Sequence, residues 1–205
     1  MRSDNSSHSR ICYDVNMELV LYILILIFGV ASYMVGLRQM MTNKYSPSVF
    51  SRVVWALLAM ISFAGVVAGG SGPASIALAA IFLIGNIAIC VTSFWKGVRS
   101  SGRLEYACLA ILAASAVVWV VFNTPIISLA MSLIAHFVGA APTYAKVWRD
   151  PKSESAGFWS LFFIASLLTV LASWGQPIYL LIFPIYFALF DGIMTFLALR
   201  RNRSR

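Results

Sequence analysis

Charge is the scarcest property of this sequence. Only 11% of its 205 residues are Asp, Glu, Lys or Arg, whereas a soluble domain carries roughly 25%. The hydrophobic residues make up 60% of the chain, and they gather in runs of about 20 residues, the length that crosses the hydrocarbon core of a bilayer. The shortage of charge leaves no room for a large soluble domain and predicts an integral, multi-pass membrane protein.

Residues for metal or covalent chemistry are equally scarce. The three cysteines, Cys12, Cys90 and Cys108, give neither a disulfide framework nor the spacing of metal ligands. Neither HExxH nor Gly-x-Ser-x-Gly occurs, and no acidic pair or Cys/His pair suggests a catalytic site. The last apolar run has no Lys for a retinal Schiff base. We therefore expect no enzyme, no metal, no cofactor and no photosensor.

The basic residues are few but regularly placed. Thirteen of the 15 Lys and Arg residues flank apolar runs on alternate loops, and the other two, Arg2 and Arg10, lie near the N-terminus. Cytoplasmic loops carry such an excess of basic residues, so we expect the N-terminus outside and the C-terminus in the cytoplasm. The net charge of +8 then reflects topology and anionic lipid headgroups rather than nucleic acid. Short loops and the absence of organellar signals favour a bacterial inner membrane.

Seven apolar runs can be placed, and lipid requires each of them to be a helix. Their approximate ranges are 17–38, 49–69, 74–97, 104–122, 125–148, 157–174 and 177–200. The chain then divides as follows: a polar tail (1–16), a three-helix bundle (17–98), a linker with the fourth helix (99–124), a second three-helix bundle (125–200) and a basic tail (201–205). The first run is too long for a cleaved secretory signal. For residues 1–16 two interpretations stay open: a disordered tail, or an extension upstream of a start at Met17.

The first three and the last three runs share one plan. In each half a helix with small residues precedes a basic loop, a second helix, a Gly/Pro turn and a third helix with one central polar residue. Matching positions are Gly29 with Gly139, Ser32 with Pro142, Phe50-Ser51 with Trp159-Ser160, Pro73 with Pro177, and Asn86 with Asp191. Because one helix separates two sets of three, both halves cross the membrane in the same direction. We predict a parallel 3+1+3 repeat.

The stretch from His136 to Trp159, HFVGAAPTYAKVWRDPKSESAGFW, adds a more specific pattern. Small residues precede Pro142 within an apolar helix, and a basic segment, a Ser/Glu/Gly turn and a new helix follow. This stretch resembles the repeat signature of the PQ-loop superfamily, which includes SWEET and SemiSWEET sugar transporters and lysosomal amino-acid exporters. Pro142-Thr143 stands where the family has Pro-Gln, and Ser32-Tyr33 stands there in the first half. The resemblance implies a carrier in which Pro142 acts as a hinge, and we expect Pro184 in the last helix to supply a second one.

Three polar residues near helix centres are the main candidates for a substrate site. An ionisable group in a membrane helix usually faces a cavity or a partner, which draws attention to Asp191 as a substrate ligand or proton carrier. Asn86 matches the position where the resemblance places a pocket asparagine, and an amide can also bind helices together. His136 could join a proton relay or bond a carbonyl that Pro142 leaves free.

Hydroxyl and aromatic groups complete the candidate list. Ser32, Tyr33 and Thr143 could add hydroxyls to the same pocket, and Trp55 could stack on a solute or pack in the core. Four further tryptophans at helix ends are interpreted as a membrane-interface belt: Trp95, Trp148, Trp159 and Trp174.

These patterns predict a small-solute transporter that works by alternating access around a midplane pocket. The expected partners are the lipid bilayer and a neutral or zwitterionic solute, sugar-like or amino-acid-like, with proton coupling through Asp191 as a secondary hypothesis. A non-transporting scaffold, a trafficking factor or a sensor of the PQ-loop type is the alternative. Whether the chain forms a homo-oligomer stays open.

Overall fold

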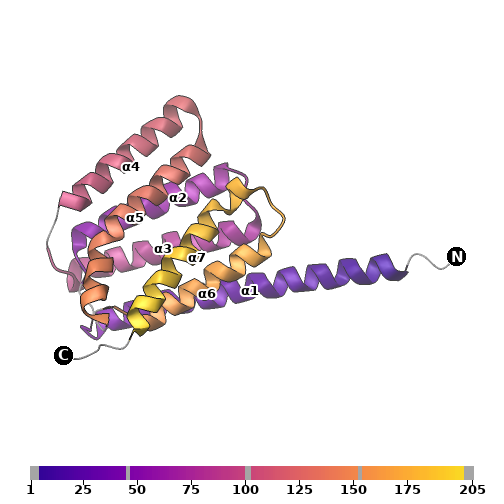
Figure 1. Cartoon of the computed structure of the whole chain (residues 1–205), viewed down its shortest axis with the longest axis horizontal. Coiled ribbons are helices and arrows are strands. Elements are labelled where there is room, and N and C mark those ends of the chain that lie inside the picture. Colours follow the sequence, from indigo (N-terminus) through magenta and orange to yellow (C-terminus); the bar gives the residue numbers. More distant parts are fainter. Residues whose placement is uncertain (1–4, 45–46, 100–102, 152–153, 201–205) are drawn as a thin grey trace.

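A computed structural model describes residues 5–44, 47–99, 103–151 and 154–200, which form helices and no strand. The seven helices are α1 (Asn5–Met41), α2 (Val49–Ala68), α3 (Pro73–Lys96), α4 (Arg103–Phe122), α5 (Pro125–Arg149), α6 (Ala156–Ala172) and α7 (Ile178–Leu199). The predicted all-helical fold is confirmed. The ends agree within a few residues except at α1, which begins at Asn5 rather than near residue 17 and projects beyond the other helices (Figure 1).

Five of these helices are long and apolar enough to cross a membrane: residues Met17–Met41 of α1, and α2, α3, α5 and α7. The apolar parts of α4 (Tyr106–Phe122) and α6 are shorter. The 17 residues of α6 extend about 25 Å at 1.5 Å per residue. The chain is therefore an integral membrane protein with at least five helices suited to lipid.

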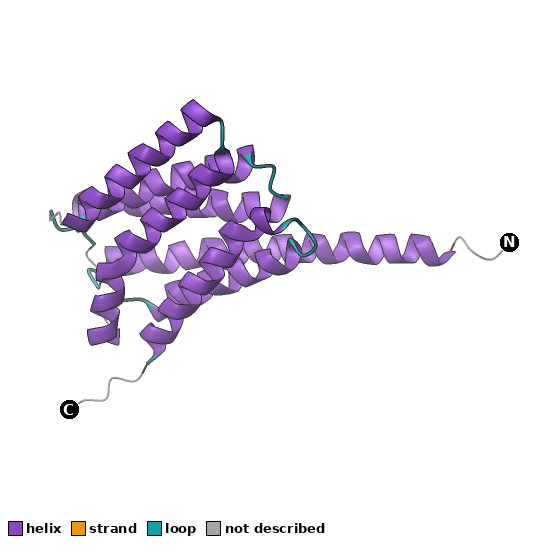
Figure 2. Cartoon of the chain, turned by 45° about the horizontal axis from the view of Figure 1, so that its top comes forward, coloured by secondary structure: helices purple, strands orange, loops and turns teal. Residues whose placement is uncertain are grey.

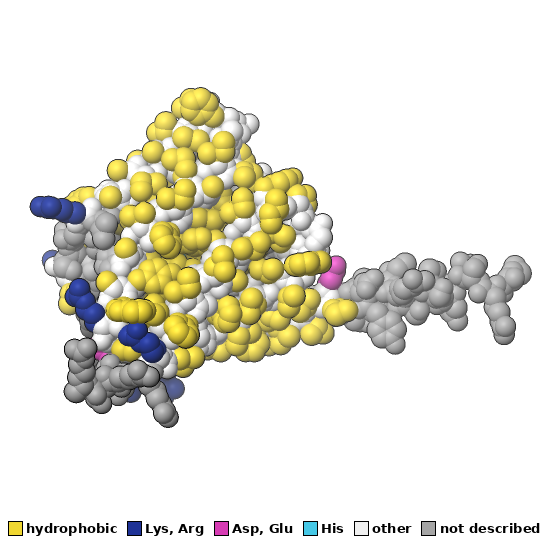
Figure 3. Space-filling model, in the orientation of Figure 1, with side chains coloured by type: hydrophobic (Ala, Val, Ile, Leu, Met, Phe, Trp, Pro, Cys, Tyr) yellow, Lys and Arg dark blue, Asp and Glu magenta, His cyan; other side chains and the backbone are white. Residues whose placement is uncertain are grey.

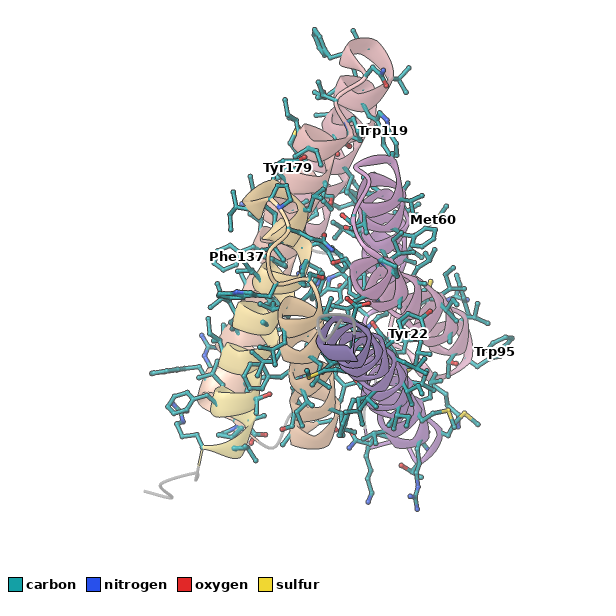
Figure 4. All side chains as sticks on the ribbon, turned by 90° about the vertical axis from the view of Figure 1, so that its right-hand side faces the viewer. Tyr22, Met60, Trp95, Trp119, Phe137 and Tyr179 are labelled. Carbon is teal, nitrogen blue, oxygen red and sulfur yellow. The ribbon has the colours of Figure 1, made fainter. Side chains whose placement is uncertain are left out.

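The surface of the described residues supports the same conclusion. Apolar side chains cover most of the visible face (Figure 3), and large apolar residues such as Tyr22, Met60, Trp95, Phe137 and Tyr179 are exposed and point outward (Figure 4). Water would penalise such a surface, whereas lipid tails do not. Lys and Arg side chains gather at the end of the molecule opposite the projecting part of α1 (Figure 3).

Six helices close a ring around a common centre. In the first triplet α3 packs against both α1 and α2, and in the last triplet α7 packs against both α5 and α6. The triplets meet where α1 packs on α6 and where α2 packs on α5, while α4 lies outside this ring against α5 and α2 (Figure 2). The centre of the ring therefore receives side chains from both triplets.

Local sequence explains how the corresponding helices begin and turn. Ser48 caps α2 by accepting a hydrogen bond from Ser51 N, and Ser155 caps α6 in the same way from Phe158 N. Gly70 and Gly175 have φ angles of 75° and 90° in the turns before α3 and α7, a backbone conformation that glycine adopts without steric cost. These two turns can therefore be tight, and they hold α2 against α3 and α6 against α7 as antiparallel neighbours.

Candidate functional site

A small cavity lies at the centre of the ring. Its volume is about 10 Å³, roughly the room that one water molecule needs. The ring helices α1, α2, α3, α5, α6 and α7 all contribute to its wall. The described lining residues are Tyr33, Arg52, Trp55, Phe82, Asn86, His136, Phe158, Trp159, Phe162, Phe187, Phe190 and Asp191. Five of the seven predicted substrate-binding residues are among them: Tyr33, Trp55, Asn86, His136 and Asp191.

Asn86 is held by bonds within the first triplet. Its Nδ2 donates to the Tyr33 hydroxyl at 2.9 Å and to the Phe82 carbonyl, one turn back in α3, at 2.8 Å. An amide has two N–H donors, so both are used. The Tyr33 ring reaches this position because Gly85 has no side chain; a Cβ there would collide with the ring.

His136 sits in a cage of aromatic rings. It is 1% exposed, and its Nδ1 lies 2.8 Å from the Tyr186 hydroxyl. The ring centroids of Phe190 and Trp55 lie 4.6 and 4.7 Å from that of His136. Its Nε2 makes no hydrogen bond to any described residue. One polar atom of His136 is therefore buried without a partner in this conformation.

Asp191 is equally buried, at 1% exposed, in the middle of α7. Its Oδ2 accepts a hydrogen bond at 3.3 Å from Ser166 in α6. A charged carboxylate at such a place is costly unless it is paired, and one hydroxyl group is a weak partner for it. Asn86 and Asp191 line the same cavity, but each takes its hydrogen bonds from its own triplet.

Trp159 corrects one prediction from the sequence. We expected it in the interfacial belt, but it is 4% exposed and lines the cavity. Its ring packs against Phe158 and Phe190, and its Nε1 makes no hydrogen bond to a described residue. The other three belt tryptophans are 61–80% exposed. Trp159 is buried because it lies on the face of α6 that is turned toward the centre of the ring.

Arg52 lines the cavity but was not predicted as a site residue, because its charge suggested that it belonged to the basic loop before the second helix. It belongs to the first turn of α2, where its guanidinium lies 5.0 Å from the centre of the Trp55 ring. Arg52 precedes Trp55 by three residues, so both lie on one face of the helix. This spacing is the feature of the sequence that could have identified Arg52 as a lining residue. Among the described lining residues, Arg52 is thus the one cationic and Asp191 the one anionic residue.

A second cavity of about 20 Å³ adjoins the first. It is lined by Gly36, Gln39, Arg52, Ile89, Glu154, Ser155, Phe158 and Trp159. Arg52, Phe158 and Trp159 line both cavities. Gln39 lies near the C-terminal end of α1 and Glu154 precedes α6, so the second cavity lies toward the basic end of the molecule.

Of the remaining predicted residues, Ser32, Thr143 and Pro184 are not among the described residues that line the central cavity. Ser32 is buried and donates to the Phe158 carbonyl at 3.0 Å, and Thr143 is partly exposed on α5. Pro184 is buried inside α7. Pro142 lies within α5, and its side chain is outside the described part of the chain. Ser32 thus joins two helices rather than a pocket.

The described residues bring together no group of three or more His, Cys, Asp or Glu side chains that could hold a metal ion. Comparisons with protein-family models, with curated proteins and with solved structures found no match. The function proposed for the chain therefore rests on the geometry of the cavity.

Proposed function

We propose that this chain is a small-solute carrier of the PQ-loop type, with seven membrane spans, which works by alternating access in a bacterial inner membrane. Its two triplets, α1–α3 and α5–α7, form a parallel repeat joined by α4. In support, α3 and α7 each contact both other members of their triplet. The matching serine caps at Ser48 and Ser155 and the matching glycine turns at Gly70 and Gly175 also support it.

The orientation follows from charge. Figure 1 shows α1, α3, α5 and α7 running in the same direction, so the basic residues at their C-terminal ends lie at one end of the ring: Arg38, Lys96, Arg149 and Arg200. The positive-inside rule places this end in the cytoplasm. The N-terminus of α1 is then outside.

The observation that carries the proposal is the cavity that both triplets share. Asn86 and Asp191 come from corresponding helices, and the ring nitrogens of His136 and Trp159 are buried without partners among the described residues. Leaving a buried polar group unpaired costs about 1–3 kcal/mol. A solute that hydrogen-bonded to these groups would recover that free energy, and this would favour its binding in the cavity.

The contacts at the two ends indicate which way the cavity opens. At the end away from the basic residues, Ser75 in α3 lies 3.2 Å from Ser173 by hydroxyl oxygens, and Gly72 N donates to Gln176 Oε1 at 3.3 Å. At the basic end Gln39 Nε2 of α1 donates to Ser155 Oγ before α6 at 2.8 Å, and the second cavity adjoins the first. Both ends are therefore bonded in this conformation, and we expect the solute to pass first at the basic end, where the second cavity extends the central one toward the cytoplasm.

Uptake into proteoliposomes tests the proposal. The purified full chain should carry at least one member of a panel of labelled sugars and amino acids with saturable kinetics. Asp191→Asn should lower that uptake at least tenfold, because it removes the charge in the cavity. The same substitution at Asp150, which is exposed after the end of α5, should leave uptake within twofold. Absence of flux across the whole panel, in protein that is folded and oriented, contradicts the proposal.

The same assay addresses proton coupling through Asp191. If Asp191 carries a proton, uptake in the wild type should respond to an imposed pH gradient and uptake in Asp191→Asn should not. An equal response of both proteins between pH 5 and 8 excludes that role.

A non-transporting scaffold is the second candidate. The small volume of the cavity favours it, since ligand sites usually enclose hundreds of Å³ and this one holds about 10 Å³. A scaffold needs no opening of the ring, so it predicts no flux and no change when the triplets are locked together.

A further inference from the structure

The lining of the central cavity is aromatic to an unusual degree. Eight of its twelve described residues are Phe, Tyr or Trp, and they come from both triplets. Aromatic rings present a negative face that attracts cations, and boxes of such rings recognise methylated ammonium groups. One cation already uses this surface, because the Arg52 guanidinium lies 5.0 Å from the centre of the Trp55 ring.

The two charged lining residues occupy different parts of the wall. Asp191 lies in the middle of α7 and bonds to Ser166 of α6. Arg52 lies at the start of α2, where the central cavity meets the one toward the basic end, and Trp159 shares that boundary. A molecule in the cavity thus meets the Asp191 carboxyl group, the Arg52 guanidinium and the Trp159 indole N–H, which bonds to no described residue, while Glu154 lies in the adjoining cavity with Arg52.

We propose that the solute is a betaine, a small zwitterion whose cationic group is a methylated ammonium. Its ammonium group faces Asp191 and the surrounding rings, and its carboxylate faces Arg52 and Trp159 Nε1. This inference rests on the proposed carrier function, since the closed cavity must widen to admit any solute.

Hydrogen bonding separates this class from ordinary amino acids. A primary ammonium has three N–H donors to satisfy, and desolvating them without replacement lowers affinity. A trimethylammonium group has none, and each of its methyl groups can lie against a ring. A wall made mainly of rings therefore selects the methylated form.

Binding to the purified full chain in lipid nanodiscs provides the test, with N,N,N-trimethylglycine and glycine as probes that differ only in three methyl groups. Isothermal titration should give at least tenfold tighter binding of trimethylglycine. Equal binding, or tighter binding of glycine, overturns the inference. This comparison uses the wild-type protein, so it does not depend on the folding of any variant.

Variants locate the site. Phe190→Leu removes a ring whose centroid is 4.6 Å from that of His136, and it should weaken trimethylglycine binding about tenfold with little effect on glycine. Phe196→Leu is the matched control, because Phe196 is on the same helix and 69% exposed. An equal effect of the two substitutions, or none from Phe190→Leu, contradicts the assignment.

The inference and the carrier proposal can fail separately. Flux of a sugar or of glycine without binding of trimethylglycine overturns the inference and leaves the carrier. Binding of trimethylglycine without flux supports a betaine-binding site but removes the carrier, and with it the identification of betaine as a transported solute.

Discussion

Two ring nitrogens distinguish this cavity from an ordinary packed core. His136 Nε2 and Trp159 Nε1 are buried and make no hydrogen bond to any described residue, although the great majority of buried polar atoms in folded proteins have a partner. Their neighbours are chiefly aromatic rings, which offer no strong acceptor. Substituting either ring therefore tests whether the cavity binds a solute or is only packed.

Trp159→Phe keeps a ring at this position and removes the N–H. Because that N–H bonds to no described residue, the substitution should cost only the lost packing, on the order of 1–2 kcal/mol. We expect solute uptake to fall about tenfold while the protein remains folded in a thermal unfolding assay. Trp174→Phe, at a site 80% exposed, is the control and should change neither. A fall in melting temperature with unchanged uptake would assign Trp159 to packing alone.

At the scale of elements, the sequence predicted which segments are helices but not which helices touch. Long apolar runs separated by Gly/Pro turns and basic loops define the seven helices, because lipid allows few other structures. Lipid tails are as apolar as the protein core, so the apolar residues of α1 or α7 do not reveal which face meets a neighbour. Polar residues do reveal the inward face, because Asn86, His136 and Asp191 are all buried and all line one cavity.

Both the lining residue that was overlooked, Arg52, and the one that was assigned to the interface, Trp159, lie in the first turns of helices. Arg52 and Trp159 follow the caps at Ser48 and Ser155 by four residues each. At such a boundary a basic residue or a tryptophan has two physically reasonable places, the interface or the interior. Only the tilt and packing of α2 and α6 decide between them, and these depend on contacts distant in sequence.

The contact between α1 and α3 gives a prediction at this scale. Gly85 packs directly against the Tyr33 ring, and a Cβ at position 85 would overlap it. Gly85→Ala should therefore push Tyr33 away from Asn86, at a cost of about 1–3 kcal/mol, and lower the melting temperature. Gly157→Ala is the control, since the nearest atom to its Cβ would lie at 3.6 Å, an ordinary contact. Equal melting temperatures of the two variants would mean that α1 and α3 can move apart at Gly85 without a loss of stability.

At the scale of the whole molecule, the ring of six helices has two kinds of contact. Contacts within a triplet, such as Asn86 with Tyr33, can stay intact while the triplets move as rigid bodies. Contacts between triplets, such as Ser75 with Ser173 and Ser62 with Ser132, have to break wherever the ring opens. Single hydrogen bonds between hydroxyl groups contribute only about 1 kcal/mol each, so the packing of α1 on α6, the most extensive between any two described helices, is the main resistance to opening.

Locking one of these contacts tests whether the ring opens at all. In a background with Cys12, Cys90 and Cys108 replaced, the pair Ser75→Cys and Ser173→Cys should form a disulfide, because the two hydroxyl oxygens lie 3.2 Å apart and a small shift brings sulfur atoms at these positions to the S–S bond length of about 2.05 Å. Oxidation should stop uptake by the carrier and reduction should restore it. The pair Ser115→Cys and Ser128→Cys, with oxygens 2.7 Å apart, joins α4 to α5 without crossing between the triplets and should leave uptake unchanged. Continued uptake with the first disulfide fully formed would show that the solute passes without separating α3 from the end of α6, and rocking of the two triplets would then be the wrong description of the motion.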